Sequence, residues 1–204
     1  MLLWGGCSSV PRDELDISQI DISNACSIFQ GRSSWYQVMD QSFRKWGTPV
    51  HVQLAIIHQE SKFRSDARPR GKSMFGLLPG PLLSSAFGYA QALDGTWAHY
   101  KEQTGNRGAN REDFRDATDF VGWYNDISNK KLGISKWDAR NLYLAYHEGH
   151  GGYAARSFRK KSWLLRVADK VDRNAVRYDK QLATCKHQFS TGDGRESNWF
   201  IWPF

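Results

Sequence analysis

The spacing of apolar residues along the chain is the feature that most limits its possible folds. In SSWYQVMDQSFRKWG (residues 33–47), apolar side chains recur at intervals of three and four residues, and Gly47 follows the last of them. This period indicates a helix with one buried face, and a glycine directly after it is typical of a helix end. Runs with a two-residue period, which would indicate strands, are almost absent. The sequence therefore predicts an all-α fold of six or seven helices, packed orthogonally.

The expected helices follow one another along most of the chain. Pro49 stands before a helix over 50–61, a place where proline is well tolerated. A turn is expected at Asp94-Gly95, between a short helix and a longer one that ends at Gly105, and Ser135 is expected to cap a later helix. The remaining helices are expected within residues 110–133, 135–149 and 162–185.

Composition narrows the class of protein. The 204 residues fit one domain, and a hydrophobic content of 40% excludes a disordered chain. The aromatic content of 14%, with 9 Trp, suits a protein that stacks flat ligands such as sugar rings or bases. The net charge of +7 implies an anionic partner, which can be nucleic acid, a membrane surface or an acidic polymer. Since no nucleic-acid-binding motif is present, nucleic acid is not expected as the partner.

The N-terminal segment LLWGGCSS resembles the end of a bacterial lipoprotein signal, in which Cys7 would carry the lipid. Residues 1–6 are too short for a whole signal, so either a longer signal is implied or the resemblance is a coincidence. We expect a signal and tether over 1–24, a domain over 25–187 and a tail over 188–204. On this basis the protein is expected in the periplasm, anchored to the outer membrane.

The two remaining cysteines, Cys26 and Cys185, lie near the two ends of the expected domain. A disulfide between them would suit an oxidising compartment and would close a long loop. The alternative is a pair of independent buried thiols, and the sequence leaves both open.

Glu60 is the first candidate for chemistry, because it ends the apolar run in AIIHQES (residues 55–61). Helical geometry places it on one face with Ile56 and Ile57. A carboxyl group against such a face loses hydration, which raises its pKa and suits a general acid. The alternative is a solvated glutamate at a helix end.

Three segments, read together, favour Glu60 as a catalytic group over a solvated glutamate. HQESKF (58–63), SSAFGYAQAL (84–93) and LAYHEGHGGY (144–153) resemble, in order and spacing, the three signature segments of SLT-type lytic transglycosylases. The resemblance covers about residues 26–185. It implies a lysozyme-like helical fold, a groove for peptidoglycan glycan strands and one catalytic glutamate. It also implies cleavage between N-acetylmuramic acid and N-acetylglucosamine with 1,6-anhydro products and without a cofactor. A monomer is expected.

The resemblance also assigns residues. Glu60 would be the catalytic acid and base, with Ser61 as its neighbour in the Glu-Ser pair. The other expected substrate-binding residues are Gly88, Tyr89, Gln91, Tyr146, His147, Glu148 and Tyr178. Tyr178 stands for a tyrosine that the family tends to direct into the site from its last helix.

The chain departs from the family pattern at several positions. Tyr89-Ala90 replace Leu-Met, and His147-Glu148 replace Asn-Ala. Glu148 could act as a second carboxylate, which would make the protein a hydrolytic muramidase; the alternative is a residue at the edge of the groove. A cell-wall-binding lipoprotein without activity is a further alternative.

Two other features have simpler explanations. In HEGH (147–150) the histidines are three residues apart, not four as on a zinc-binding helix, so no metal is expected. The basic loop, with Arg64, Arg68, Arg70 and Lys72, could meet carboxylates of the substrate or could simply be solvated. Trp97 and Tyr153 are expected in the groove.

Overall fold

The computed structural model describes residues 16–69 and 84–190, and within these ranges all regular elements are helical. The all-α prediction is therefore confirmed. The helices are α1 (Ala25–Gly31), α2 (Ser33–Trp46), α3 (Val50–Ser61), α4 (Asp94–Thr104), α5 (Phe114–Leu132), α6 (Ala139–Ala154) and α7 (Ser162–Cys185). Three short 3-10 helices are η1 (Ile17–Gln19), η2 (Ser157–Lys160) and η3 (Lys186–Gln188).

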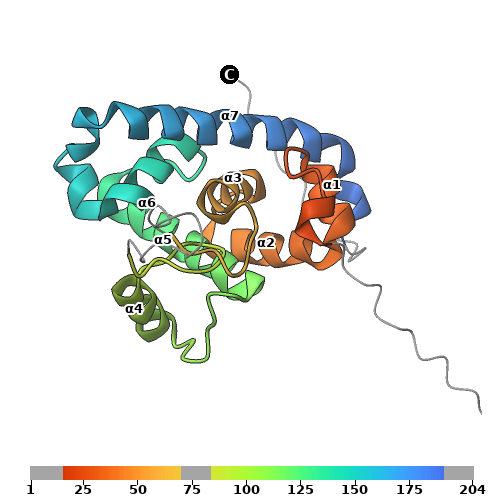
Figure 1. Ribbon diagram of the computed structural model, residues 1–204, viewed down its shortest axis with the longest axis horizontal. Coiled ribbons are helices and arrows are strands. Elements are labelled where there is room, and N and C mark those ends of the chain that lie inside the picture. The colour runs from red at the N-terminus through yellow and green to blue at the C-terminus, as the bar shows by residue number, and fades with distance from the viewer. Residues whose placement is uncertain (1–15, 70–83, 191–204) are drawn as a thin grey trace, which may run out of the picture.

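Helix α3 lies in the middle of the molecule (Figure 1). Its residues from Val52 to Ile57 are all fully buried, because α2, α5, α6 and α7 all pack against it. A helix that is enclosed on every side needs apolar residues all round, which explains why its sequence shows no polar stripe. The long helix α7 runs along one edge of the molecule, with α1, α3 and α6 beneath it (Figure 1). The last turn of α3, from His58 to Glu60, is less buried than its middle.

Helix ends agree with several expectations. Gly47, Gly105 and Gly133 adopt left-handed backbone conformations directly after α2, α4 and α5. Asp138, and not Ser135, caps α6, because its carboxylate accepts a hydrogen bond from the backbone N–H of Asn141 at 2.9 Å. The expectation of Ser135 as the cap was wrong.

The short helix expected before α4 is also absent. Gly88 and Gln91 have φ of 76° and 49°, values that do not continue a right-handed helix. Phe87 and Ala92 instead form an isolated antiparallel bridge, and Asp94 and Gly95 belong to the first turn of α4. Contacts to Ala67 and Arg111 on either side of this segment override the local helical pattern.

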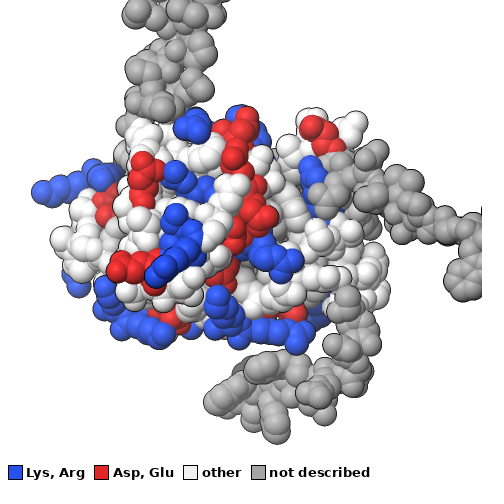
Figure 2. Space-filling model, turned by 90° about the horizontal axis from the view of Figure 1, so that it is seen from below, with Lys and Arg blue, Asp and Glu red and all other residues white. Residues whose placement is uncertain are grey.

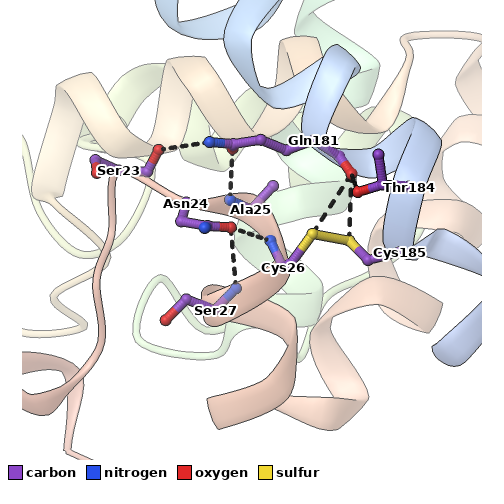
Figure 3. The surroundings of a disulfide bond; sticks show 8 residues. All are labelled: Ser23, Asn24, Ala25, Cys26, Ser27, Gln181, Thr184 and Cys185. Atoms are coloured by element: carbon purple, nitrogen blue, oxygen red, sulfur yellow. Dashed lines mark hydrogen bonds between the residues drawn. A yellow bond between two sulfur atoms is a disulfide. The ribbon is translucent and has the colours of Figure 1, made fainter.

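A disulfide joins Cys26 in α1 to Cys185 at the end of α7, across 159 positions of the chain (Figure 3). The predicted pairing is confirmed. Gln181, one turn before Cys185, accepts a hydrogen bond from the backbone N–H of Ala25 at 2.8 Å. The two ends of the domain are thus joined by a covalent bond and by polar contacts.

Residues at both margins of the expected domain pack on its body. Ile20 is buried, and Phe189 lies against the rings of Phe29 and Tyr36. Cys7 and most of the aromatic tail, residues 191–204, lie outside the described residues. None of the described helices combines the length and the apolar character needed to cross a membrane.

Replacing both Cys26 and Cys185 with Ser should lower the free energy of unfolding by about 2–5 kcal/mol, because the cross-link restricts a long loop in the unfolded chain. Chemical denaturation with and without a reductant checks this. With the reductant, the wild type should become as unstable as the double variant. The stability of the double variant itself should not change. Equal stability of the oxidised wild type and the variant would contradict the prediction.

Candidate active site

Glu60 occupies the last turn of α3, directly above the fully buried Ile56 and Ile57. The residue itself is only half-buried, so one side of it remains accessible. Burial raises the pKa of Glu60 to about 7, and a hydrogen bond from Tyr143 limits the rise. A carboxyl group with this pKa is substantially protonated at neutral pH, and it can both donate and accept a proton.

Two tyrosines of α6 lie beside this carboxyl group. Tyr143 is hydrogen-bonded to Glu60, and its pKa lies far above the usual range because of burial and the charge of Glu60. Burial, followed by the charge of Glu60, also raises the pKa of Tyr146. The Tyr146 hydroxyl donates to the backbone oxygen of Ala90 at 2.6 Å. Since both phenols stay protonated, they act at the site as hydrogen-bond donors.

The segment from Phe87 to Ala92 forms another side of the site, through the contact of Ala90 with Tyr146. The backbone N–H of Gly88 donates to Ala67 O at 3.0 Å, and that of Tyr89 donates to Arg111 O at 3.2 Å. A Cβ on Gly88 would lie 2.2 Å from the oxygen of Arg111. Only glycine allows this close approach, so Gly88 sets the path of the segment.

Gln91 is held in one orientation by this segment. Its side-chain nitrogen donates to the oxygens of Ala67 and Gly88, both at 2.8 Å. Within the described part of the chain, its amide oxygen has no hydrogen-bond partner and is thus left for a ligand. Ser61 is buried, and its hydroxyl donates to Ile57 O at 3.3 Å, so it supports the end of α3.

Glu148 is bound by side chains other than Glu60. Its side chain is only 3% exposed and accepts a hydrogen bond from Lys161 at 2.7 Å. It also accepts one from the hydroxyl of Ser157 in η2. Burial alone would raise the pKa of Glu148, but hydrogen bonds from three neighbouring side chains lower it to about 2. This carboxylate joins α6 to η2 and the start of α7.

His147 and Tyr178 have different surroundings. The ring of His147 lies between those of Tyr143 and Trp163, with centroids 6.4 and 5.2 Å away. Tyr178 is fully buried, and its hydroxyl donates to Ile22 O at 2.6 Å and contacts His58. The hydroxyl that reaches Glu60 belongs to Tyr143.

The remaining candidates are dispersed. Trp97 is buried among Tyr100 and Phe120, and Tyr153 donates to Asn141 at 3.0 Å while stacking on Phe158. The guanidinium group of Arg68 lies 3.9 Å from the centre of the Phe87 ring, and Arg64 pairs with Asp66. Arg70 and Lys72 lie outside the described residues. In the described ranges, no group of three or more His, Cys, Asp or Glu could hold a metal ion.

Sequence analysis missed Tyr143 and Trp163. Tyr143 precedes Tyr146 by three residues, so helical spacing alone places both on one face of α6. That spacing was the available signal for Tyr143. Trp163 is 48% exposed and reaches the site region through His147, a contact between α6 and α7 that no local pattern indicates.

Comparison with known proteins gives one family. The family model described as the transglycosylase SLT domain matches residues 1–185. No curated protein matches the chain.

Gly88→Ala should lower stability by about 2 kcal/mol or more, because the added Cβ meets the backbone of Arg111 at a positive φ. Activity should fall with it, since Gln91 would be displaced. Thermal unfolding and release of soluble glycan from sacculi measure the two effects. Gly95→Ala is the matched control for stability, because nothing lies within 4 Å of its added Cβ. Equal unfolding of the two variants would contradict the assigned role of Gly88.

Proposed function

The chain belongs to the transglycosylase SLT family, whose members are lytic transglycosylases of peptidoglycan, and we propose that Glu60 is its catalytic acid and base. The observation that carries this proposal is the position of Glu60. It ends a buried helix, and burial raises its pKa to about 7. A group of this kind is half protonated near neutral pH and serves both proton transfers.

In the first step, the Glu60 carboxyl group donates its proton to the glycosidic oxygen between N-acetylmuramic acid and N-acetylglucosamine. The C1–O bond breaks, and its electron pair stays on the departing oxygen. The N-acetyl oxygen of the muramoyl residue attacks C1 from the opposite face and stabilises the positive charge. In the second step, Glu60, now ionised, removes the proton of the C6 hydroxyl, whose oxygen replaces the N-acetyl oxygen at C1. A 1,6-anhydro ring forms, and no water is consumed.

The engagement of Glu148 by other side chains supports a transglycosylase over a hydrolytic muramidase. Hydrolysis by inversion or by a covalent intermediate commonly needs two carboxylates on either side of the bond. Glu148 is the candidate that the sequence offers, but Lys161 and Ser157 already bind its carboxylate, and only 3% of its side chain is exposed. The N-acetyl group of the substrate would take its place.

We assign substrate contacts to the groups around Glu60. The free amide oxygen of Gln91 would accept from a sugar hydroxyl or amide, and the hydroxyl oxygens of Tyr143 and Tyr146, whose hydrogens are donated to Glu60 and Ala90, could also accept. Gly88, Tyr89 and Ser61 would shape the walls. The exposed ring of Trp163, beside His147, would offer a flat apolar surface to a sugar ring.

We also propose that the enzyme works in the periplasm, where peptidoglycan lies and where the disulfide would be stable. A lipid on Cys7 would anchor it to the outer membrane. This proposal rests on the sequence around Cys7 alone. Membrane fractionation of the wild type and Cys7→Ser tests it, and an equal distribution of the two would argue against a lipid on this residue.

Glu60→Gln should abolish release of muropeptides from purified sacculi while leaving folding and glycan binding nearly intact, because Gln has the same shape and no acidic proton. Product masses from the wild type should show anhydro-muramoyl ends, which are lighter by one water than hydrolytic ends. Glu148→Gln is the control and should give the same anhydro masses. Hydrolytic masses that depend on Glu148 would support the muramidase instead.

The activity of the wild type should fall above pH 7, because the first step needs protonated Glu60 and its pKa is about 7. Tyr143→Phe should move this decline to higher pH, since the Tyr143 hydroxyl stabilises the carboxylate and lowers its pKa. The pH dependence of kcat/KM measures the shift. Tyr178→Phe should leave the decline in place, because the Tyr178 hydroxyl is bonded to Ile22. A shift in Tyr178→Phe alone would reverse the roles of the two tyrosines.

A further inference from the structure

Helix α7 carries a row of basic side chains on its outer face. The row comprises Arg166, Lys170, Arg173, Arg177 and Lys180, all of them exposed. Successive members are four, three, four and three residues apart. Because a helix turns by about 100° per residue, these intervals keep all five within an arc of about 80°. With a rise of 1.5 Å per residue, the row is about 21 Å long.

This basic row lies opposite the buried face of α7. The buried face consists of Leu164, Ala168, Val171, Asn174, Ala175, Tyr178, Leu182 and Cys185. These residues are centred about half a turn away from the basic row, and they face α1, α3 and α6. Figure 1 shows no described element on the outer side of α7. The row is thus separated from the Glu60 site by the thickness of a helix.

Three acidic residues of α7 lie within the span of the row, and none of them pairs with it; one, Asp172, lies about 120° around the helix from the centre of the row. Asp169 pairs with Arg140 at 2.6 Å, and Asp179 pairs with His51 at 3.1 Å. Among the described residues, the side chains of four members of the row form no ion pair or hydrogen bond, namely Arg166, Lys170, Arg173 and Lys180. Only Arg177 is engaged, since it donates to Ser23 O at 3.0 Å and to Asn174 at 2.9 Å.

The side of the molecule opposite α7 has a different distribution of charged side chains. In Figure 2, which views the molecule from below and therefore from the side away from α7, acidic and basic side chains are interspersed. Acidic groups form a band across the middle of that view. The face in Figure 2 is therefore mixed in charge, whereas the exposed row on α7 consists of basic residues.

The C-terminal half of the row also borders a groove of about 450 Å³. Its lining comprises Arg173, Val176, Arg177, Lys180, Gln181 and Thr184. Val176 is 50% exposed and contributes an apolar surface among the three cations. This combination suits a ligand with carboxylates on a short aliphatic backbone, because the carboxylates meet cations and the aliphatic part meets Val176.

We propose that the outer face of α7 binds the carboxylates of peptidoglycan stem peptides, as a second contact with the wall outside the catalytic groove. The inference rests on the proposed function for its choice of polymer. Peptidoglycan carries an acidic peptide on its muramoyl residues, so a row of about 21 Å can meet more than one peptide at once. Weak ion pairs made together hold the enzyme on the wall between cleavage events.

Binding is tested by co-sedimentation with purified sacculi, in chains that all carry Glu60→Gln so that the sacculi stay intact. The test variant adds Arg166→Gln, Lys170→Gln, Arg173→Gln and Lys180→Gln, and it leaves Arg177 in place because that side chain contacts Ser23. At low salt, the test variant should bind at least about fourfold more weakly, since each of the four exposed pairs contributes about 0.2–1 kcal/mol. High salt should remove most of the difference.

The matched control removes the same charge elsewhere, by Arg44→Gln, Arg107→Gln, Arg115→Gln and Lys130→Gln. These exposed residues belong to α2, α5 and the loop before α5. The control should bind sacculi like the parent chain. Equal weakening of both variants would show that only net charge matters and would overturn the proposal. Unfolding midpoints of both variants verify folding, and Arg173→Glu with Lys180→Glu serves as a second test.

Two further arms identify the ligand. Glycan strands from which the peptides have been removed keep only the lactyl carboxylates of the muramoyl residues, so the difference between the parent chain and the test variant should be much smaller on them than on sacculi. Vesicles with anionic phospholipid should not bind better than sacculi; stronger binding to vesicles, lost in the test variant, would assign the face to a membrane instead. All readouts measure binding, so they are independent of whether Glu60 is the catalytic residue.

Discussion

The desolvation of one carboxyl group at the end of α3 is the interaction on which the site depends. Glu60 would be an ordinary acid in water, and burial raises its pKa to about 7. That burial exists because α3 is enclosed by other helices and carries apolar residues up to Ile57. The buried middle of α3 therefore supports both the fold and the proposed acid–base chemistry.

The groups around Glu60 come from separate parts of the chain, and each is held by its own contacts. Gly88 allows its segment to approach Arg111, and the bond from Tyr146 to Ala90 joins this segment to α6. Glu148 joins α6 to η2 and α7 through Ser157 and Lys161. A carboxylate that resembles a catalytic group in the sequence thus has a structural task in the fold.

The two faces of helix α7 differ: the inner face packs on the domain, and the outer face is exposed. The inner face covers α3 and, with the disulfide to α1, joins the two ends of the domain. The outer face carries the basic row, on the side away from the proposed site of cleavage at Glu60. An enzyme that works on an insoluble polymer benefits from such a division, because holding the wall and cutting it then need not compete for the same residues.

The sequence by itself determined the all-α class, most helix ends and the candidate Glu60, because helical period, terminal glycines and ordered motifs are local signals. It left open whether Cys26 and Cys185 pair, and only the approach of α1 to the end of α7 decided this. It could not determine the path of the segment around Gly88, the cap at Asp138 or the surroundings of Glu148. It also could not show that Tyr143, and not Tyr178, reaches Glu60. Those features depend on contacts between distant segments, and only the packing of α3 against α6 and α7 decides which side chain meets which.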